Sequence, residues 1–142
     1  MKKTKILSLF LLICITASLL CMQASARSSN YLDAYRVVLT PQSGGKIAIT
    51  VDVDGIRSMT QIGASTIYLY ESTNGTDFTR IKTYDHEKYP IMMGSGIHWL
   101  EDIATYYGVV GRYYYATAYC YAGDETGYDE KSYTTSTVRA KA

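Results

Sequence analysis

Six tyrosines in two short segments are the residues whose type and spacing point most directly to a function. They are Tyr68, Tyr70, Tyr113, Tyr115, Tyr119 and Tyr121. Within each segment they share one parity, and alternate residues of a β-strand project to the same face about 6–7 Å apart. Phenol rings offer flat surfaces with hydrogen-bonding rims, which suit stacking on sugars or packing on a protein partner. The sequence therefore predicts a ligand-binding face made of these residues.

This face requires the second segment, Gly111–Gly123, to turn its other side chains inward. The side chains that we expect to be buried are Tyr114, Ala116, Ala118 and Cys120. Alanine and free cysteine are more often buried than tyrosine. The reverse register would bury four tyrosines, and each buried hydroxyl would then need a partner. A second interpretation is that the tyrosines only cover a sheet and pair across strands.

No catalytic arrangement is predicted, so we expect the protein not to be an enzyme. Ser95, His98 and Asp102 could form a triad by composition alone, but no G-x-S-x-G motif supports them. His86 and His98 are the only histidines, whereas zinc sites usually need three or four ligands.

An acidic stretch near the C-terminus could bind Ca²⁺, which prefers several oxygen ligands. Its carboxylates are Asp124, Glu125, Asp129 and Glu130. Their spacing matches no EF-hand, and neither does that of Asp52 and Asp54 before Gly55. A solvated loop is the favoured interpretation, and no metal or other cofactor is predicted.

The first 26 residues have the organisation of a secretory signal peptide. Three lysines precede the apolar run Ile6–Leu20, and Ala24-Ser25-Ala26 forms a cleavage site. Cys21 raises the alternative of a lipoprotein, but Leu20 stands where a lipobox has a small residue. We therefore expect removal of residues 1–26 and secretion of the protein, with no membrane association after cleavage.

Residues 27–142 are expected to fold as a single domain, since 116 residues can bury a core without disulfides. They carry eleven basic and thirteen acidic side chains, so the basic surface that binds nucleic acid or anionic membranes is missing. Cys120 is their only cysteine. It is predicted to be a small buried hydrophobe, or, if exposed, the site of an intermolecular bridge.

The chain is rich in short alternating segments separated by turn residues. In order, the expected strands are Tyr31–Thr40, Lys46–Asp54, Ser65–Glu71, Phe78–Tyr84, Ile97–Thr105, Gly111–Gly123 and Ser132–Arg139. Ile47, Ile49, Val51 and Val53 should line the core side of the second. Met59–Ile62 is expected to cross between two sheets.

The connections carry recognisable signals. Asn74-Gly75 predicts a hairpin turn, which also explains the formal glycosylation sequon Asn74-Gly75-Thr76. Phe78–Tyr84, the strand after this turn, is expected to lie at a sheet edge or to contain a bulge. Tyr84 of this strand would extend the row of tyrosines. Asp85–Gly96 and Gly123–Lys131 are expected to be loops. A short helix at Trp99–Tyr107 is the alternative to the fifth strand.

Seven such strands in about 110 residues predict an all-β fold, namely a seven-stranded antiparallel two-sheet Greek-key sandwich. The segments Ile67–Tyr84 and Gly111–Gly123 resemble fibronectin type III and immunoglobulin-like domains. In such domains the strand called F opens with a tyrosine known as the corner tyrosine, and in this resemblance Tyr114 takes its place. This resemblance implies that the strand of Tyr68 and Tyr70 lies beside the strand of the other four tyrosines.

The run from Gly44-Gly45-Lys46 to Tyr121-Ala122-Gly123 also resembles small uncharacterised secreted bacterial proteins from Gram-positive species, which implies no activity. We therefore expect a secreted binding or adhesion module whose tyrosine face contacts an unknown glycan or extracellular protein. The alternatives are a structural subunit that associates with itself through the same tyrosines or through edge strands, and an enzyme inhibitor.

Overall fold

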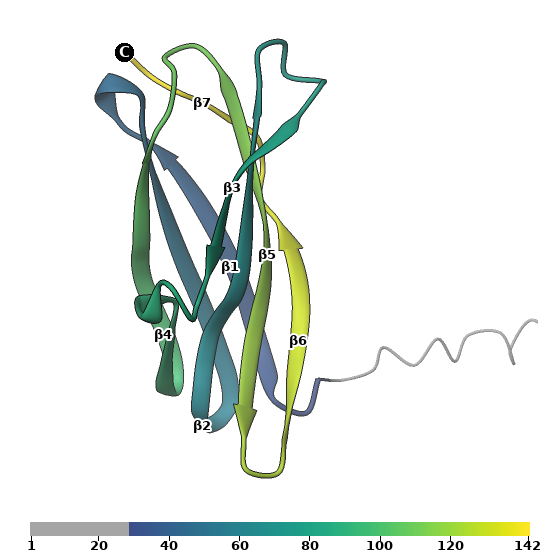
Figure 1. The fold of residues 1–142 in the computed structure, drawn as a ribbon. Helices are drawn as coiled ribbons and strands as arrows, with labels where there is room; N and C mark the ends of the chain where they lie inside the picture. Colours follow the sequence, from purple (N-terminus) through teal and green to yellow (C-terminus); the bar gives the residue numbers. More distant parts are fainter. Residues whose placement is uncertain (1–28) are drawn as a thin grey trace, which may run out of the picture.

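The computed structural model describes residues 29–142, so the predicted signal peptide lies outside the described part of the chain. These residues form one strongly curled, antiparallel β-sheet (Figure 1). The strands are β1 (Leu32–Pro41), β2 (Lys46–Ser72), β3 (Thr79–Asp85), β4 (Met93–Tyr107), β5 (Tyr113–Asp124), β6 (Gly127–Thr134) and β7 (Val138–Arg139). Two short helical turns, Ser43–Gly45 and Pro90–Met92, join them. The all-β prediction is confirmed.

β2 is the strand around which the sheet is built. Its first half pairs with β1 and β4, and its second half pairs with β5 and β3. The expected crossing at Met59–Ile62 falls where β2 changes partners, since pairing with β1 ends at Gly55 and pairing with β5 begins at Gln61. The two strands predicted on either side of it are a single strand, Lys46–Ser72. The register with β4 shifts between Asp54 and Ile62, so bulges absorb the change of partner without ending the strand.

Gly63 allows β2 to lie very close to the Pro90–Met92 turn. Its φ is 146°, and a Cβ at this position would lie 2.1 Å from the carbonyl oxygen of Met92. Any side chain here would collide with the Pro90–Met92 turn and would also strain the backbone. The glycine therefore lets β2 run beside the start of β4.

β1 and β6, the first and last strands of the order β1-β2-β5-β6, are connected by side-chain contacts. Tyr35 of β1 and Tyr133 of β6 meet edge to face, with ring centroids 6.4 Å apart. Asp129 of β6 accepts hydrogen bonds from the Ser29 hydroxyl and from the N–H groups of Asn30 and Tyr31. These contacts anchor the start of β1 against β6 and hold the curl of the sheet.

The core lies on the inner side of the curled sheet. Ile47, Ile49, Val51 and Val53 are fully buried, as their alternation predicted. Each such side chain contributes about 1.5–3 kcal/mol when it leaves water. Tyr114, Ala116, Ala118 and Cys120 of β5 are fully buried as well, so the expected register of this strand is confirmed.

Three expectations about the C-terminal half need correction. The loop predicted at Asp85–Gly96 ends early because β4 begins at Met93, and the alternative helix at Trp99–Tyr107 is part of this strand. The loop predicted at Gly123–Lys131 is instead a tight β5–β6 hairpin. Asp124 makes this turn possible, since its carboxylate accepts hydrogen bonds from the N–H and hydroxyl of Thr126.

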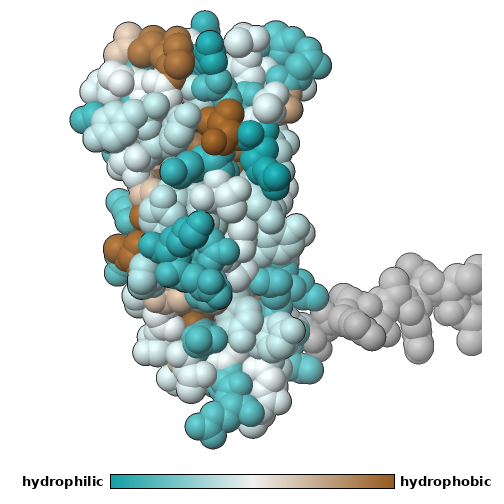
Figure 2. All heavy atoms as spheres, viewed as in Figure 1, coloured by the Kyte–Doolittle hydropathy of each residue, from teal (hydrophilic) through white to brown (hydrophobic). Residues whose placement is uncertain are grey.

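The expected last strand is divided. β6 ends at Thr134, and the short β7 pairs with the start of β5 through Arg139 and Tyr113. Figure 2 shows a largely hydrophilic surface on the side drawn, where the hydrophobic residues form small, separate groups.

Candidate ligand-binding face

The tyrosine face is the outer surface of the second half of β2 together with β5. Its members are Tyr68, Tyr70, Tyr113, Tyr115, Tyr119 and Tyr121, and all six are half-buried. They point away from the core because their neighbours in sequence point into it.

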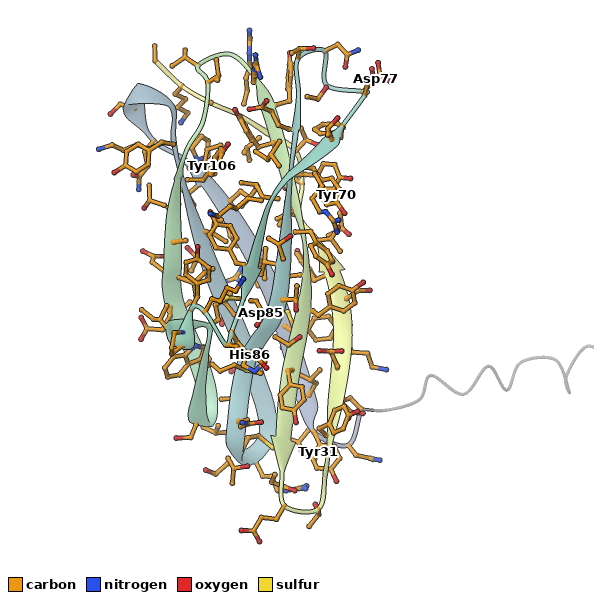
Figure 3. All side chains as sticks on the ribbon, viewed as in Figure 1. Tyr31, Tyr70, Asp77, Asp85, His86 and Tyr106 are labelled. Atoms are coloured by element: carbon orange, nitrogen blue, oxygen red, sulfur yellow. The ribbon has the colours of Figure 1, made fainter. Side chains whose placement is uncertain are left out.

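The two groups of tyrosines lie beside each other, as the resemblance implied. Tyr70 stands directly opposite Tyr115 in the sheet, and their rings stack at a centroid distance of 4.7 Å and an interplanar angle of 10°. Tyr68 meets Tyr119 edge to face at 6.0 Å. Figure 3 shows Tyr70 below the β2–β3 hairpin, whose tip carries Asp77. The face is therefore a set of paired rings and not a row of independent ones.

Residues of the β2–β3 hairpin enlarge this face, and the sequence reading missed them. The Phe78 ring meets Tyr115 edge to face at 4.7 Å, and the Arg80 guanidinium lies 4.8 Å from the Tyr68 ring centroid. The Asn74-Gly75 turn was the signal that could have found them, since hairpin geometry sets which residues of the returning strand stand beside Tyr70.

Two more residues extend the face from the C-terminal strands. Tyr128 of β6 stacks on Tyr121 with centroids 5.2 Å apart, and the Arg139 guanidinium lies 5.5 Å from the Tyr113 ring centroid. Tyr128 was missed because its segment was predicted to be a loop. No sequence signal places Arg139, because β7 is only two residues long.

Tyr84 does not extend the tyrosine row, contrary to expectation. It stands opposite Ile67, whose side chain faces the core, so the phenol ring turns inward and is 3% exposed. Its ring meets Tyr89 at 5.2 Å. Burial, with smaller effects from Tyr89 and Tyr106, raises the pKa of Tyr84 to about 12.

The hydroxyl groups of the tyrosine face differ from that of the buried Tyr114. The Tyr114 hydroxyl accepts a hydrogen bond from the Val109 N–H at 2.8 Å and donates one to Glu71 Oε2 at 2.5 Å. Burial first, and then the Glu71 hydrogen bond, raise the Tyr114 pKa to about 12. None of the six hydroxyls of the tyrosine face bonds another residue within 29–142. They are therefore available to a ligand.

The residues considered for a catalytic triad have other partners. His98 Nε2 lies 2.9 Å from Asp52 Oδ1, and this hydrogen bond is the main cause of a lowered pKa at Asp52. Asp102 accepts a hydrogen bond from the Thr50 hydroxyl. Ser95 bonds neither His98 nor Asp102 in the described range, so these three residues do not form a triad there.

Three of the four acidic side chains considered for calcium binding, all except Glu125, contact other residues of the fold. Asp124 bonds Thr126 and forms an ion pair with Arg57, and the Thr126 hydroxyl is the first cause that lowers its pKa to about 2. Asp129 anchors the segment before β1, and Glu130 accepts a hydrogen bond from Ser65. Within residues 29–142, no group of three His, Cys, Asp or Glu side chains is placed to hold a metal ion.

Cys120 is a free, fully buried cysteine, as expected for a small core hydrophobe. Burial is the main cause that raises the pKa of its thiol to about 12. An intermolecular bridge through this thiol would require the β5 region to open.

The geometry defines an all-β protein with an antiparallel sheet and an aromatic outer surface. The chain matches none of the protein-family models with which it was compared, and no curated protein matches it either. No helix within residues 29–142 has the length and apolar character needed to cross a membrane.

Proposed function

We propose that this protein is a secreted, non-enzymatic binding or adhesion module that contacts a glycan or an extracellular protein through the tyrosine face. One observation carries the proposal. Six half-buried phenol rings share one outer surface, and their hydroxyls have no partner within residues 29–142. A surface of this kind offers stacking and hydrogen bonding to the same ligand.

Ring pairing supports binding because it orders the surface before a ligand arrives. Tyr115 packs against both Tyr70 and Phe78, and Tyr121 packs against Tyr128. Side chains that are already ordered lose less conformational entropy on binding, and each immobilised side chain otherwise costs about 0.5–1.5 kcal/mol.

A glycan is the better supported ligand because the tyrosine face lacks exposed aliphatic side chains. The large aliphatic residues with exposed side chains all lie elsewhere, namely Val38, Ile56, Ile91, Ile97, Leu100, Val109 and Val110. Protein interfaces are also enriched in Tyr and Arg, but their fully buried centre is more apolar than the rest of the surface. A flat surface of phenol rings suits the face of a sugar ring better.

For the fold we infer a two-sheet sandwich of the fibronectin type III or immunoglobulin-like kind. The pairing of β1 and β4 with one half of β2, and of β3 and β5 with the other half, supports this inference. The hydrogen bond from the Val109 N–H to the Tyr114 hydroxyl also supports it, since corner tyrosines of such domains bond backbone a few residues upstream. Secretion rests on the signal peptide that the sequence predicts.

The double variant Tyr115→Ser/Tyr119→Ser tests the proposal. We expect it to lose binding on a glycan array and in pull-downs from cell wall and extracellular matrix. Tyr107→Ser is the control, because Tyr107 is 71% exposed and lies at the end of β4, away from the tyrosine face. If the double variant keeps its circular dichroism spectrum and binds every ligand of the unmodified protein equally well, the proposal is wrong.

Self-association is a second candidate, which the edge of β4 favours. This fifteen-residue strand pairs only with β2 among the described residues, and it exposes Ile97 and Leu100. An open edge of this length can pair with the same edge of another copy. Light scattering at several protein concentrations separates the candidates, since growth of large species without added ligand supports assembly.

A further inference from the structure

We propose that the ligand of the tyrosine face is an acidic glycan, whose carboxylate or sulfate groups bind Arg80 and Arg139. This inference rests on the proposed function, because it names the class of ligand for the same surface. It comes from the placement of arginine charge around the tyrosine rings.

Arg80 and Arg139 differ from the other arginines of the described range. Residues 29–142 contain five arginines, of which Arg36, Arg57 and Arg112 form ion pairs with carboxylates. Arg80 and Arg139 have no carboxylate partner within this range, and both are exposed. These two are also the ones that lie over rings of the tyrosine face. The arginine charge that is not paired with a carboxylate is therefore concentrated on the proposed binding surface.

The sheet register places the two arginines at opposite edges of the face. Arg80 of β3 stands opposite Tyr70, which stands opposite Tyr115. Arg139 of β7 stands opposite Tyr113, one row further along β5. The strands follow one another across this surface in the order β3, β2, β5, β7, and neighbouring strands are about 4.8 Å apart. The backbones of β3 and β7 are therefore separated by about 15 Å measured along the sheet. A ligand that reaches both arginines must therefore be elongated and must cross the rings between them.

Both guanidinium groups retain N–H donors for an anion. Each lies near a phenol ring, and Arg139 Nε donates a hydrogen bond to the carbonyl of Gly111 at 2.9 Å. These contacts hold the planar group in place while its terminal N–H groups remain without a protein partner in residues 29–142. Guanidinium groups bind carboxylate and sulfate-like oxyanions through two parallel hydrogen bonds.

The carboxylates nearest this surface are already engaged. Glu71 bonds both Arg112 and Tyr114. Glu130 accepts a hydrogen bond from Ser65, and Asp77 accepts one from Asn74. Of these three carboxylates, only Glu71 is paired with a cation, whereas Glu130 and Asp77 keep their negative charge. We therefore expect the acidic groups of the ligand to contact the face at Arg80 and Arg139, which have no carboxylate partner within residues 29–142.

Binding of defined oligosaccharides to the purified protein, produced from the full 142-residue sequence, tests this inference. The carboxylate probe is an oligogalacturonate, and its fully methyl-esterified form is the neutral control with the same sugar rings. Dextran sulfate and dextran form the corresponding sulfate pair. We expect a charged probe to bind at least about tenfold more tightly than its neutral form, because charge-assisted hydrogen bonds are stronger than neutral ones. Added salt should weaken this binding.

The variant Arg80→Gln/Arg139→Gln should lose about tenfold or more in affinity for the charged probe and nothing for the neutral one. Arg36→Gln/Lys88→Gln removes the same charge away from the face and should bind like the unmodified protein. Preference for galacturonate or for dextran sulfate identifies carboxylate or sulfate as the recognised group, and either result supports the inference.

Equal binding of the charged and neutral probes overturns the acidic-glycan inference, and so does full affinity in Arg80→Gln/Arg139→Gln. Binding of none of these probes, or of a protein alone in the pull-down, also overturns it. The proposed function survives these results if Tyr115→Ser/Tyr119→Ser loses the ligand that is bound. The proposed function fails if Tyr115→Ser/Tyr119→Ser binds that ligand with the affinity of the unmodified protein.

Discussion

Tyr70 and Tyr115 stack almost in parallel across β2 and β5, with ring centroids 4.7 Å apart. They are directly opposite each other in the register of the two strands. This pair joins the two runs of tyrosine that are more than forty positions apart in the sequence. The stacked pair therefore makes one surface out of two strands.

The Tyr70–Tyr115 stack should be measurable as an energetic coupling. In a double-mutant cycle with Tyr70→Ala and Tyr115→Ala, we expect a coupling of about 0.5–1.5 kcal/mol in the free energy of urea unfolding. The cycle removes the separate loss of the Phe78 contact from the result. Tyr70 and Tyr128 serve as the control pair, whose effects should add. Additive effects at Tyr70 and Tyr115 would contradict the stacked geometry.

The buried Tyr114 hydroxyl should contribute more to stability than any hydroxyl of the tyrosine face. Tyr114→Phe leaves the Val109 N–H without its acceptor and Glu71 without one donor. We expect the free energy of unfolding to fall by about 1–3 kcal/mol. Tyr113→Phe is the matched control and should change it by less than about 0.5 kcal/mol. Equal effects of the two changes would show that the Tyr114 hydroxyl does not form its hydrogen bonds with Val109 and Glu71.

Cys120 should resist alkylation while the protein is folded. Its pKa of about 12 lies well above the ordinary thiol value, so little thiolate exists at pH 8. Burial also blocks access to the sulfur. Mass spectrometry of the peptide that contains Cys120 should find it unlabelled by iodoacetamide in buffer and labelled in urea. Rapid labelling in buffer would mean that β5 has the opposite register.

Stability should fall in acid as Asp124 and Asp129 lose their charge. Hydrogen bonds from Thr126 lower the pKa of Asp124 to about 2, and those from Ser29, Tyr31 and Asn30 lower the pKa of Asp129. A carboxyl with a lowered pKa stabilises the fold above its unfolded value of about 3.9, and this contribution disappears as the pH falls through the folded value. The free energy of unfolding should therefore drop between about pH 4 and pH 2.

Urea titrations across this range measure the acid effect. The drop should be smaller in Asp124→Asn and Asp129→Asn, because neither variant can gain the proton. An unchanged drop in both variants would assign the acid sensitivity to other carboxyl groups.

Local patterns were sufficient to predict β1, β3, the core side of the first half of β2 and the inner side of β5. The alternation of Ile47, Ile49, Val51 and Val53, and the small side chains at Ala116, Ala118 and Cys120, predicted burial correctly because side-chain parity is fixed within a strand. The pairing of β2 with β5 came from a resemblance, since no local pattern specifies which distant strands become neighbours.

The errors arose where tertiary contacts decide the backbone. β2 continues as one strand through its change of partners, where Gly63 packs closely beside Met92, and no local pattern shows this continuity. The β5–β6 hairpin depends on Asp124 bonding Thr126, in a segment whose acidity suggested a loop. Tyr84 turned inward because its partner in the register is Ile67. Arg80 and Arg139 joined the tyrosine face through their strand positions, which only the assembled sheet defines.

The most direct test of the tyrosine face is an NMR titration of the isotope-labelled protein with the glycan that binds most tightly on the array. The account predicts saturable amide shifts concentrated in the second half of β2 and in β5, and loss of these shifts in Tyr115→Ser/Tyr119→Ser. Saturable shifts concentrated instead on β1 and β4, with the tyrosine strands unchanged, would contradict it.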